Sequence, residues 1–424
     1  MYKISQSIPV VALILSVLIA WSVGHDLPQE YAASSNTESG YSVKHVFEAS
    51  DFKAVWVPYL SLDMQHEAQQ HFGVFKEKFD RIIQNVSESG ANTVLVHVHA
   101  FGDAMYRSSY YPWSHLLTGT QGKDPGYDAL AYMVEAAHNA GLKIHAWINP
   151  LRIRSAQTPL SLAEDHIRNQ WLNDTDDVND AWTVETETGI YFNPAYEEVR
   201  TYIINSVREL IANYNVDGVH MDDYFYPTQA EGFDATAYAS YCAQVPDGAE
   251  RKSLAEWRTN NINLLVRGLY SAVKEQNKQL LFGVSPQGNI ENCAAVYADI
   301  ATWGGQDGYV DYLCPQLYYP FNSPTQPFET VAQAWVELVR APSVALYGGL
   351  ALYKAGDPAA DNGAWAADGT VVRRQLEVLQ QAGYKGFALY SDAYLKTAQT
   401  ATEMKEVLAC LGVAQQAPQA SSVS

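Results

Sequence analysis

Two kinds of apolar segment alternate along the chain. Short apolar runs predict buried strands, and between them lie longer segments in which apolar residues recur every three or four positions, as in an amphipathic helix. The predicted strands are 54–59, 93–101, 143–150, the start of 216–227, 281–287, 310–318, 344–350 and 386–391. The predicted helices are 74–87, 127–140, 197–214, 254–276, 328–339 and 371–382.

Eight strands separated by helix-sized segments predict an α/β fold: a single parallel (β/α)8 or TIM barrel with extended loops after its strands. A doubly wound open sheet is the alternative. When such a sheet binds nucleotides, a glycine-rich phosphate loop follows its first strand, whereas Pro58, Tyr59, Leu60 and Ser61 follow the first strand here. The barrel is therefore favoured.

The N-terminal end has the composition of a targeting segment. Lys3 precedes an apolar run at 8–20, so we expect 1–24 to be a signal peptide or an N-terminal anchor. The predicted parts after it are a flexible linker at 25–50, the barrel at 51–410 and a disordered tail at 411–424. We therefore expect an exported protein, in the periplasm, the cell envelope or outside the cell, that meets a membrane only through an uncleaved anchor.

Composition narrows the choice of partner. A net charge of −20 leaves no basic surface for nucleic acid. The 28 Tyr and 10 Trp supply flat apolar rings with polar tips, which suit stacking on sugars, although most such rings pack protein cores. The four cysteines, Cys242, Cys293, Cys314 and Cys410, are scattered and lack metal-ligand spacing, and no cofactor is predicted.

The segment 216–227, VDGVHMDDYFYP, combines a strand with two carboxylates. Alternation places Gly218, His220 and Asp222 on one face and apolar side chains on the other. A barrel strand is buried on both faces, so a buried histidine and aspartate require a reason to be there. The structural alternative is a strand that runs into an Asp-rich turn, with Asp223 capping the next segment.

Polar residues recur where the other predicted strands end, and in a barrel these ends surround one mouth. Besides Asp222 and Asp223, the predicted substrate-binding residues are Asp103, Trp147, Asn149, Arg152, His220, Tyr224, Gln287, Gln316, Tyr318, Lys354 and Asp392. Each also has a structural interpretation: interior histidines as core residues, tyrosines as rim packing, and the two cations as surface charges.

Carboxyl groups in an aromatic, acidic mouth suit glycosidic cleavage. One carboxyl protonates the leaving oxygen, and another stabilises the oxocarbenium ion or activates water. Asp222 and Asp223 are the predicted catalytic residues. Because side chains of neighbouring residues diverge in an extended strand, the two can also serve one role together, with the second carboxyl supplied by Asp103, Asp392 or an insertion loop.

The segments that carry a family resemblance are AVWVPYL at 54–60, NTVLVHVHAFGDAMY at 92–106, GLKIHAWINPLR at 141–152, YFNPAYEEVRTYI at 191–203, VDGVHMDDYFYP, FGVSPQG at 282–288, VDYLCPQLYY at 310–319, GLALYK at 349–354 and GFALYS at 386–391. Over about residues 51–395 the chain resembles the bacterial glycosyl hydrolase-like proteins grouped near family 10 glycosidases. That family includes exported proteins that act on peptidoglycan glycan strands, and the resemblance implies a TIM barrel.

Two details modify the resemblance. The family usually has Gln and Arg where this chain has His97 and His99, which predicts a changed pocket floor. In addition, DGVHMDDY is similar to the DGxDxDxE strand of chitinases, with Tyr224 in place of the acidic Glu. This frame implies that Asp222 orients a substrate N-acetyl group and that another residue, Asp223 in our hypothesis, supplies the acid.

The sequence thus predicts an exported glycoside hydrolase that cleaves an amino-sugar-containing glycan, with peptidoglycan glycan strands as the expected partner and substrate. A glycan-binding barrel without catalysis is the first alternative. The second is a metal-dependent hydrolase that would use His97, His99, His145, His220 and Asp222, since the His-x-His pair places two imidazoles on one strand face.

Overall fold

The computed structural model describes residues 46–413. The predicted signal or anchor, nearly all of the predicted linker and most of the predicted tail lie outside this range. Among the residues it describes, no helix combines the length and the apolar character needed to cross a membrane.

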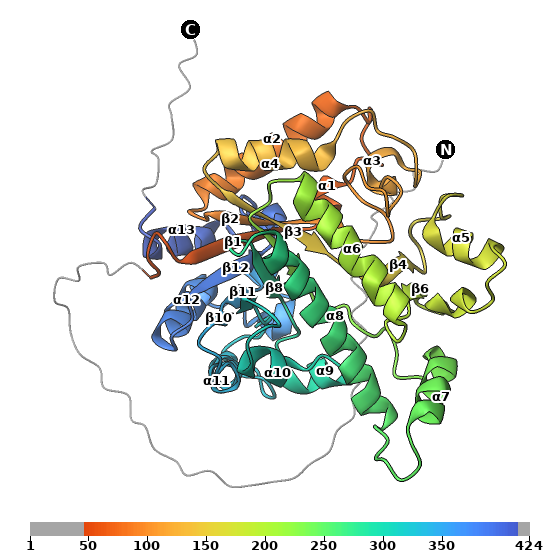
Figure 1. The fold of residues 1–424 in the computed structure, drawn as a ribbon. Helices are drawn as coiled ribbons and strands as arrows, with labels where there is room; N and C mark the ends of the chain where they lie inside the picture. Colours follow the sequence, from red (N-terminus) through yellow and green to blue (C-terminus); the bar gives the residue numbers. More distant parts are fainter. Residues whose placement is uncertain (1–45, 414–424) are drawn as a thin grey trace, which may run out of the picture. The chain divides into compact units, whose positions relative to one another are not determined.

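A parallel sheet forms the centre of the described chain (Figure 1). Its order is β10-β9-β8-β7-β3-β2-β1-β12-β11. The strands are β1 (Phe52–Val57), β2 (Thr93–His99), β3 (Lys143–Ile148), β7 (Gly218–Met221), β8 (Leu281–Val284), β9 (Tyr312–Leu313), β10 (Ala345–Leu346), β11 (Gly348–Leu350) and β12 (Gly386–Tyr390). β10 and β11 flank Tyr347 and are two halves of the predicted seventh strand. Because β10 pairs with β9 and β11 with β12, the sheet closes almost completely, and the predicted TIM barrel is confirmed.

Amphipathic helices cover the outside of the barrel (Figure 1). They are α2 (Phe72–Glu88), α4 (Ala129–Asn139), α6 (Glu197–Asn213), α8 (Leu254–Gln276), α11 (Phe328–Leu338), α12 (Val371–Gln381) and α13 (Ala401–Cys410). The six predicted helices agree within two residues at each end. The predictions omitted α13, which begins shortly after β12.

Extra structure fills the loops after several strands, as the prediction of extended loops implied. After β3 come a three-stranded antiparallel sheet, β4 (Arg152–Ser155), β5 (Thr183–Thr186) and β6 (Gly189–Phe192), and helix α5 (Ile167–Asn173). The other short helices are α1 (Tyr59–Leu62), α3 (His115–Thr118), α7 (Ala235–Gln244), α9 (Ile290–Ala295) and α10 (Ile300–Gly305). Four-residue strands and helices of four to seven residues are too short to show a clear period, and the ten-residue α7 buries none of its side chains, so the sequence pattern did not reveal these elements.

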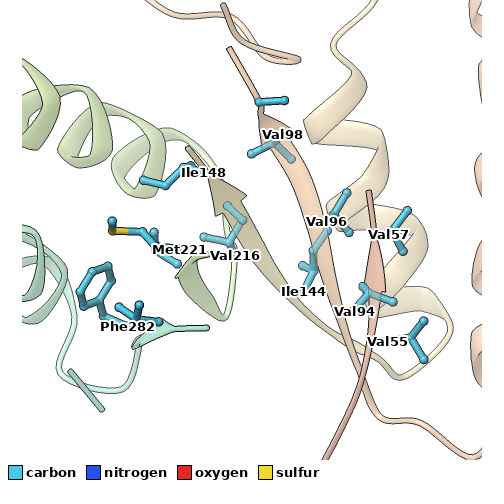
Figure 2. Packing of buried hydrophobic residues seen from close by; sticks show 14 of the residues in the cluster. Val55, Val57, Val94, Val96, Val98, Ile144, Ile148, Val216, Met221 and Phe282 are labelled. Carbon is cyan, nitrogen blue, oxygen red and sulfur yellow. The ribbon is translucent and has the colours of Figure 1, made fainter. Parts of the chain in front are cut away.

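The two faces of each barrel strand have different neighbours. Outward side chains such as Val219 and Met221 belong to the large apolar cluster that packs between sheet and helices. Figure 2 shows part of this cluster, including Val55, Val94 and Phe282. The alternation predicted for β7 is therefore observed, and its other face, with His220 and Asp222, points into the barrel.

Aromatic rings and glycines share the barrel interior. The Tyr312 ring lies directly against Gly283, where an added Cβ would stand 2.0 Å from the ring. The Tyr312 hydroxyl lies 2.9 Å from Nδ1 of His220 and 3.0 Å from Nδ1 of His145, and Trp56 Nε1 donates to His220 Nε2 at 3.1 Å. A large residue on one strand thus occupies the space left by a glycine on the next, as barrel layers require.

Gly283→Ala should lower the free energy of unfolding by about 1–3 kcal/mol, because the new methyl group would push the Tyr312 ring out of its hydrogen-bonded position. Gly305→Ala is the matched control, since a Cβ added at that position would meet nothing within 4 Å. Urea denaturation of both variants measures the difference. Equal midpoints for the two variants would show that the interior is not packed in this way.

Candidate active site

Asp222 lies just beyond the end of β7 and points into the mouth of the barrel, where it is only 5% exposed. Trp147 Nε1 donates to its Oδ2 at 3.1 Å, and Asn149 Nδ2 donates to its Oδ1. The backbone N–H of Tyr224 also donates to Oδ1, at 3.3 Å. Trp147 and Asn149, at the end of neighbouring β3, and the turn after β7 therefore hold this carboxyl in one orientation.

Asp223 is half-buried and has a different support. Gln316, which follows β9, donates from Nε2 to Asp223 Oδ1 at 3.1 Å and to the carbonyl oxygen of Ser285 at 3.2 Å. The two neighbouring carboxyls are thus held by different strand ends, Asp222 by that of β3 and Asp223 by that of β9.

Burial and mutual repulsion change the ionisation of this pair. Burial, followed by the charge of Asp223, raises the pKa of Asp222 to about 7. Burial also raises the pKa of Asp223. Since the two groups influence each other, they titrate as a pair, and the pair keeps one proton up to nearly neutral pH. Such a pair has a proton to donate and a negative charge at the same time.

Arg152 and Tyr224 form one side of the site. The Arg152 guanidinium lies 4.5 Å from the centre of the Tyr224 ring and 4.7 Å from that of Phe101. Its Nη2 donates to Asn149 Oδ1 at 2.9 Å. Tyr224 itself is 50% exposed, so its ring is a surface that a ligand in the mouth can reach.

Further tyrosines extend the site, and of these Tyr318 is among the predicted substrate-binding residues. Tyr390 points inward from the end of β12. Burial raises its pKa, and the charges of Tyr224 and Asp222 add to this effect. Tyr318 lies beside it, with ring centroids 6.2 Å apart, and Tyr353 packs edge-on against both. Tyr59, just after β1, packs against His97. Strict alternation along 386–390 places Tyr390 inward, so this signal was present in the sequence.

The predicted histidines are interior residues below the site. His97 stacks on Trp147 at 3.8 Å between ring centroids, and burial holds its pKa well below the usual range. His220 is fully buried, and both its nitrogens have partners inside the barrel. The prediction that His220 contacts substrate is therefore corrected, because both ring nitrogens are hydrogen-bonded within the barrel and the side chain is not exposed in the mouth.

Two other predicted residues have partners away from the pair. Asp103 is buried and bound to His115 and Gln121 at 2.7 and 3.0 Å. Lys354 donates to the carbonyl oxygen of Tyr318 and pairs with Asp361. These contacts do not bring either side chain to Asp222.

Asp392 and Gln287 also make their contacts with residues other than Asp222 and Asp223. Asp392 accepts a hydrogen bond from Ser61 at 2.8 Å, and burial raises its pKa to about 6. Gln287 is half-buried, and its backbone pairs with that of Gln316. The residues that direct contacts unite are thus Asp222, Asp223, Trp147, Asn149, Arg152, Tyr224 and Gln316.

Within residues 46–413, no three His, Cys, Asp or Glu side chains lie close enough together to form a metal-binding group. The histidines considered for a metal are separated by their own partners: His97 faces Asn149, and His145 faces Tyr312. The described residues therefore offer a carboxyl pair, rather than a ligand cluster, as the chemical group of the mouth.

The structure thus combines a TIM barrel with two neighbouring carboxyls and several tyrosines at the ends of its strands, the position at which barrel enzymes have their active sites. Residues 51–367 match the family described as glycosyl hydrolase-like 10. The chain belongs to this family, which confirms the family predicted from its motifs.

Proteins similar to this chain include "Glycosyl hydrolase YngK" of Bacillus subtilis (strain 168), which is 33% identical over 322 residues that cover 72% of this chain and 61% of that protein. "Glycosyl hydrolase DigH" of Escherichia coli (strain K12) is 30% identical over 396 residues, 87% of each chain. The present chain thus spans about three fifths of the first relative and most of the second.

Solved structures share the fold at low identity. The glycoside hydrolase domain of PgaB from Bordetella bronchiseptica has a TM-score of 0.53 at 12% identity, covering 86% of this chain and 98% of that one. The β-galactosidase of Marinomonas ef1 has a TM-score of 0.54 at 11% identity, covering 85% and 59%. These similarities support the barrel fold.

Asp223→Asn should move the titration of Asp222 to lower pH, because it removes a negative charge that raises the Asp222 pKa. Infrared difference spectra recorded against pH follow the protonated carboxyl band, and the Asp222→Asn variant identifies the component that belongs to this residue. Asp392→Asn is the control, since it should remove a separate component near pH 6. An Asp222 midpoint that stays in place or rises would contradict the paired titration.

Proposed function

We propose that this protein hydrolyses glycosidic bonds in an amino-sugar-containing glycan, and that its substrate is the glycan strand of peptidoglycan. The family and the names of its relatives support glycan hydrolysis. The amino-sugar part rests on the chitinase-like frame of residues 217–224. Export to the cell envelope rests on Lys3 and the apolar run at 8–20, which are typical of a secretory signal.

The observation that carries the proposal is the pair of neighbouring carboxyls, held by Trp147, Asn149 and Gln316, within a mouth lined by tyrosines. Tyr224, Tyr318 and Tyr390 offer rings on which sugars can stack, and Arg152, the cation beside the pair, is only 9% exposed. Such a surface suits a neutral polyhydroxyl chain better than a phosphorylated one.

In the proposed reaction, the pair gives its proton to the glycosidic oxygen as the bond between that oxygen and the anomeric carbon breaks. The pair is then fully ionised and stabilises the positive charge that develops on the sugar. Water adds its hydroxide to the anomeric carbon and returns its other proton to the pair. Trp147, Asn149 and Gln316 keep the two carboxyls in place throughout.

A glycan-binding barrel without turnover is the second candidate. The residue that favours it is Tyr224, which stands where a chitinase-like strand has its acidic Glu and which packs over Arg152. If the pair cannot replace that acid, the tyrosine-lined mouth would hold a glycan without cleaving it.

Asp222→Asn should reduce kcat by about 10²–10⁴-fold, because the variant lacks the carboxyl that holds the proton near neutral pH. The amide has nearly the same volume, so the circular dichroism spectrum should remain that of the folded barrel. Asp177→Asn, an exposed aspartate, is the matched control and should keep full activity. Activity of Asp222→Asn equal to that of the control would remove Asp222 from the mechanism.

Digestion of purified glycan strands, with and without stem peptides, tests the substrate directly. We expect shorter fragments whose masses identify the bond that is cut, and no fragments with Asp222→Asn. Binding of intact strands without any new product would instead support the second candidate. If the protein neither binds nor cleaves these strands, peptidoglycan is rejected as the substrate.

A further inference from the structure

Arg152 is a buried cation without an ion pair. It is 9% exposed, and no carboxylate among the described residues lies within ion-pair distance of it. Its Nε donates to the carbonyl oxygen of Ala100 at 2.9 Å, and the rings of Phe101 and Tyr224 lie near its planar group. A buried charge is costly unless something compensates it, so its position needs an explanation.

The compensation runs through the amide of Asn149. Arg152 can only donate hydrogen bonds, so its Nη2, 2.9 Å away, identifies the oxygen end of that amide. His97 Nε2 lies 2.7 Å from the same oxygen and therefore carries the proton of its ring. With the oxygen engaged twice, the amide nitrogen must face Asp222, to which it donates.

We propose that Arg152 is the internal counter-ion of the Asp222–Asp223 pair and acts through Asn149, so that both are positioning residues rather than substrate contacts. The inference rests on the proposed function and deepens it. With one proton on the pair, its single negative charge balances Arg152 and the resting site is neutral. When that proton passes to the leaving oxygen, one negative charge is left uncompensated, at the moment when the sugar becomes positive.

The charge of Arg152 reaches titratable groups on several elements. Burial is the main cause that lowers the pKa of His97 and His99 on β2, and the charge of Arg152 acts in the same direction. It also acts to lower the pKa of Asp222 and Asp223, against the larger effect of burial. Across the small sheet, Tyr191 of β6 is its partner in register, and Tyr224 packs over it.

Arg152→Gln removes the charge, so the pair should hold its last proton more tightly. We expect the infrared midpoint of Asp222, near pH 7 in the parent, to rise by about 1 pH unit or more. Arg152→Lys retains the charge and should stay closer to the parent. Arg154→Gln is the matched control, because Arg154 lies on the same strand but pairs with Glu185, and it should leave the midpoint of Asp222 unchanged.

An unchanged or lower midpoint in folded Arg152→Gln would overturn the proposal. If that variant does not fold, Arg152→Met provides the test, because it also removes the charge but keeps an apolar side chain beside Phe101 and Tyr224, and the midpoint must still rise. These titrations need no glycan, so they remain decisive even if the proposed substrate is wrong.

Kinetics separate positioning from substrate contact. If Arg152 is a positioning residue, Arg152→Gln should lower kcat and move the alkaline limb of the pH profile of kcat/KM to higher pH. Arg152→Lys, which retains the charge, should return that limb to the pH seen in the parent. A raised KM with an unmoved pH profile would show instead that Arg152 binds substrate.

Discussion

The site depends on the hydrogen bonds that hold a buried carboxyl at the end of β7. A carboxylate taken out of water is tolerated only when donors replace the lost solvent, and Asp222 has three of them, from Trp147, Asn149 and the Tyr224 backbone. All three lie on β3, directly after it, or in the turn after β7. The parallel pairing of β3 with β7 is therefore the constraint from which the geometry of the site follows.

The barrel interior keeps these two strands in register. Tyr312 fills the space beside Gly283 and meets His145 of β3 and His220 of β7 through its hydroxyl. One side chain from β9 thus connects the two strands that carry the carboxyl and its donors. The side chains below the mouth have a structural role, and the proposed chemistry belongs to the carboxyl pair at the mouth.

Much of this arrangement could be predicted from sequence. The eight strands, six of the helices, the inward direction of Asp222 and its neighbourhood with Trp147 and Asn149 all follow from two periodicities and the rule that strand ends converge. The partners of His220 and Asp103 could not be predicted, because they depend on which rings occupy the interior and on how the loop after β2 folds back. The role of Arg152 depends on the direction of a single amide, which sequence does not reveal.

The central claim is that the carboxyl pair acts on a glycosidic oxygen. A crystal structure of Asp222→Asn with a bound oligosaccharide cut from its glycan substrate tests this most directly. We expect a glycosidic oxygen within hydrogen-bond distance of residue 222 or 223, with a sugar ring packed on Tyr224 or Tyr390. An oligosaccharide that binds with every glycosidic oxygen away from both residues would contradict the claim.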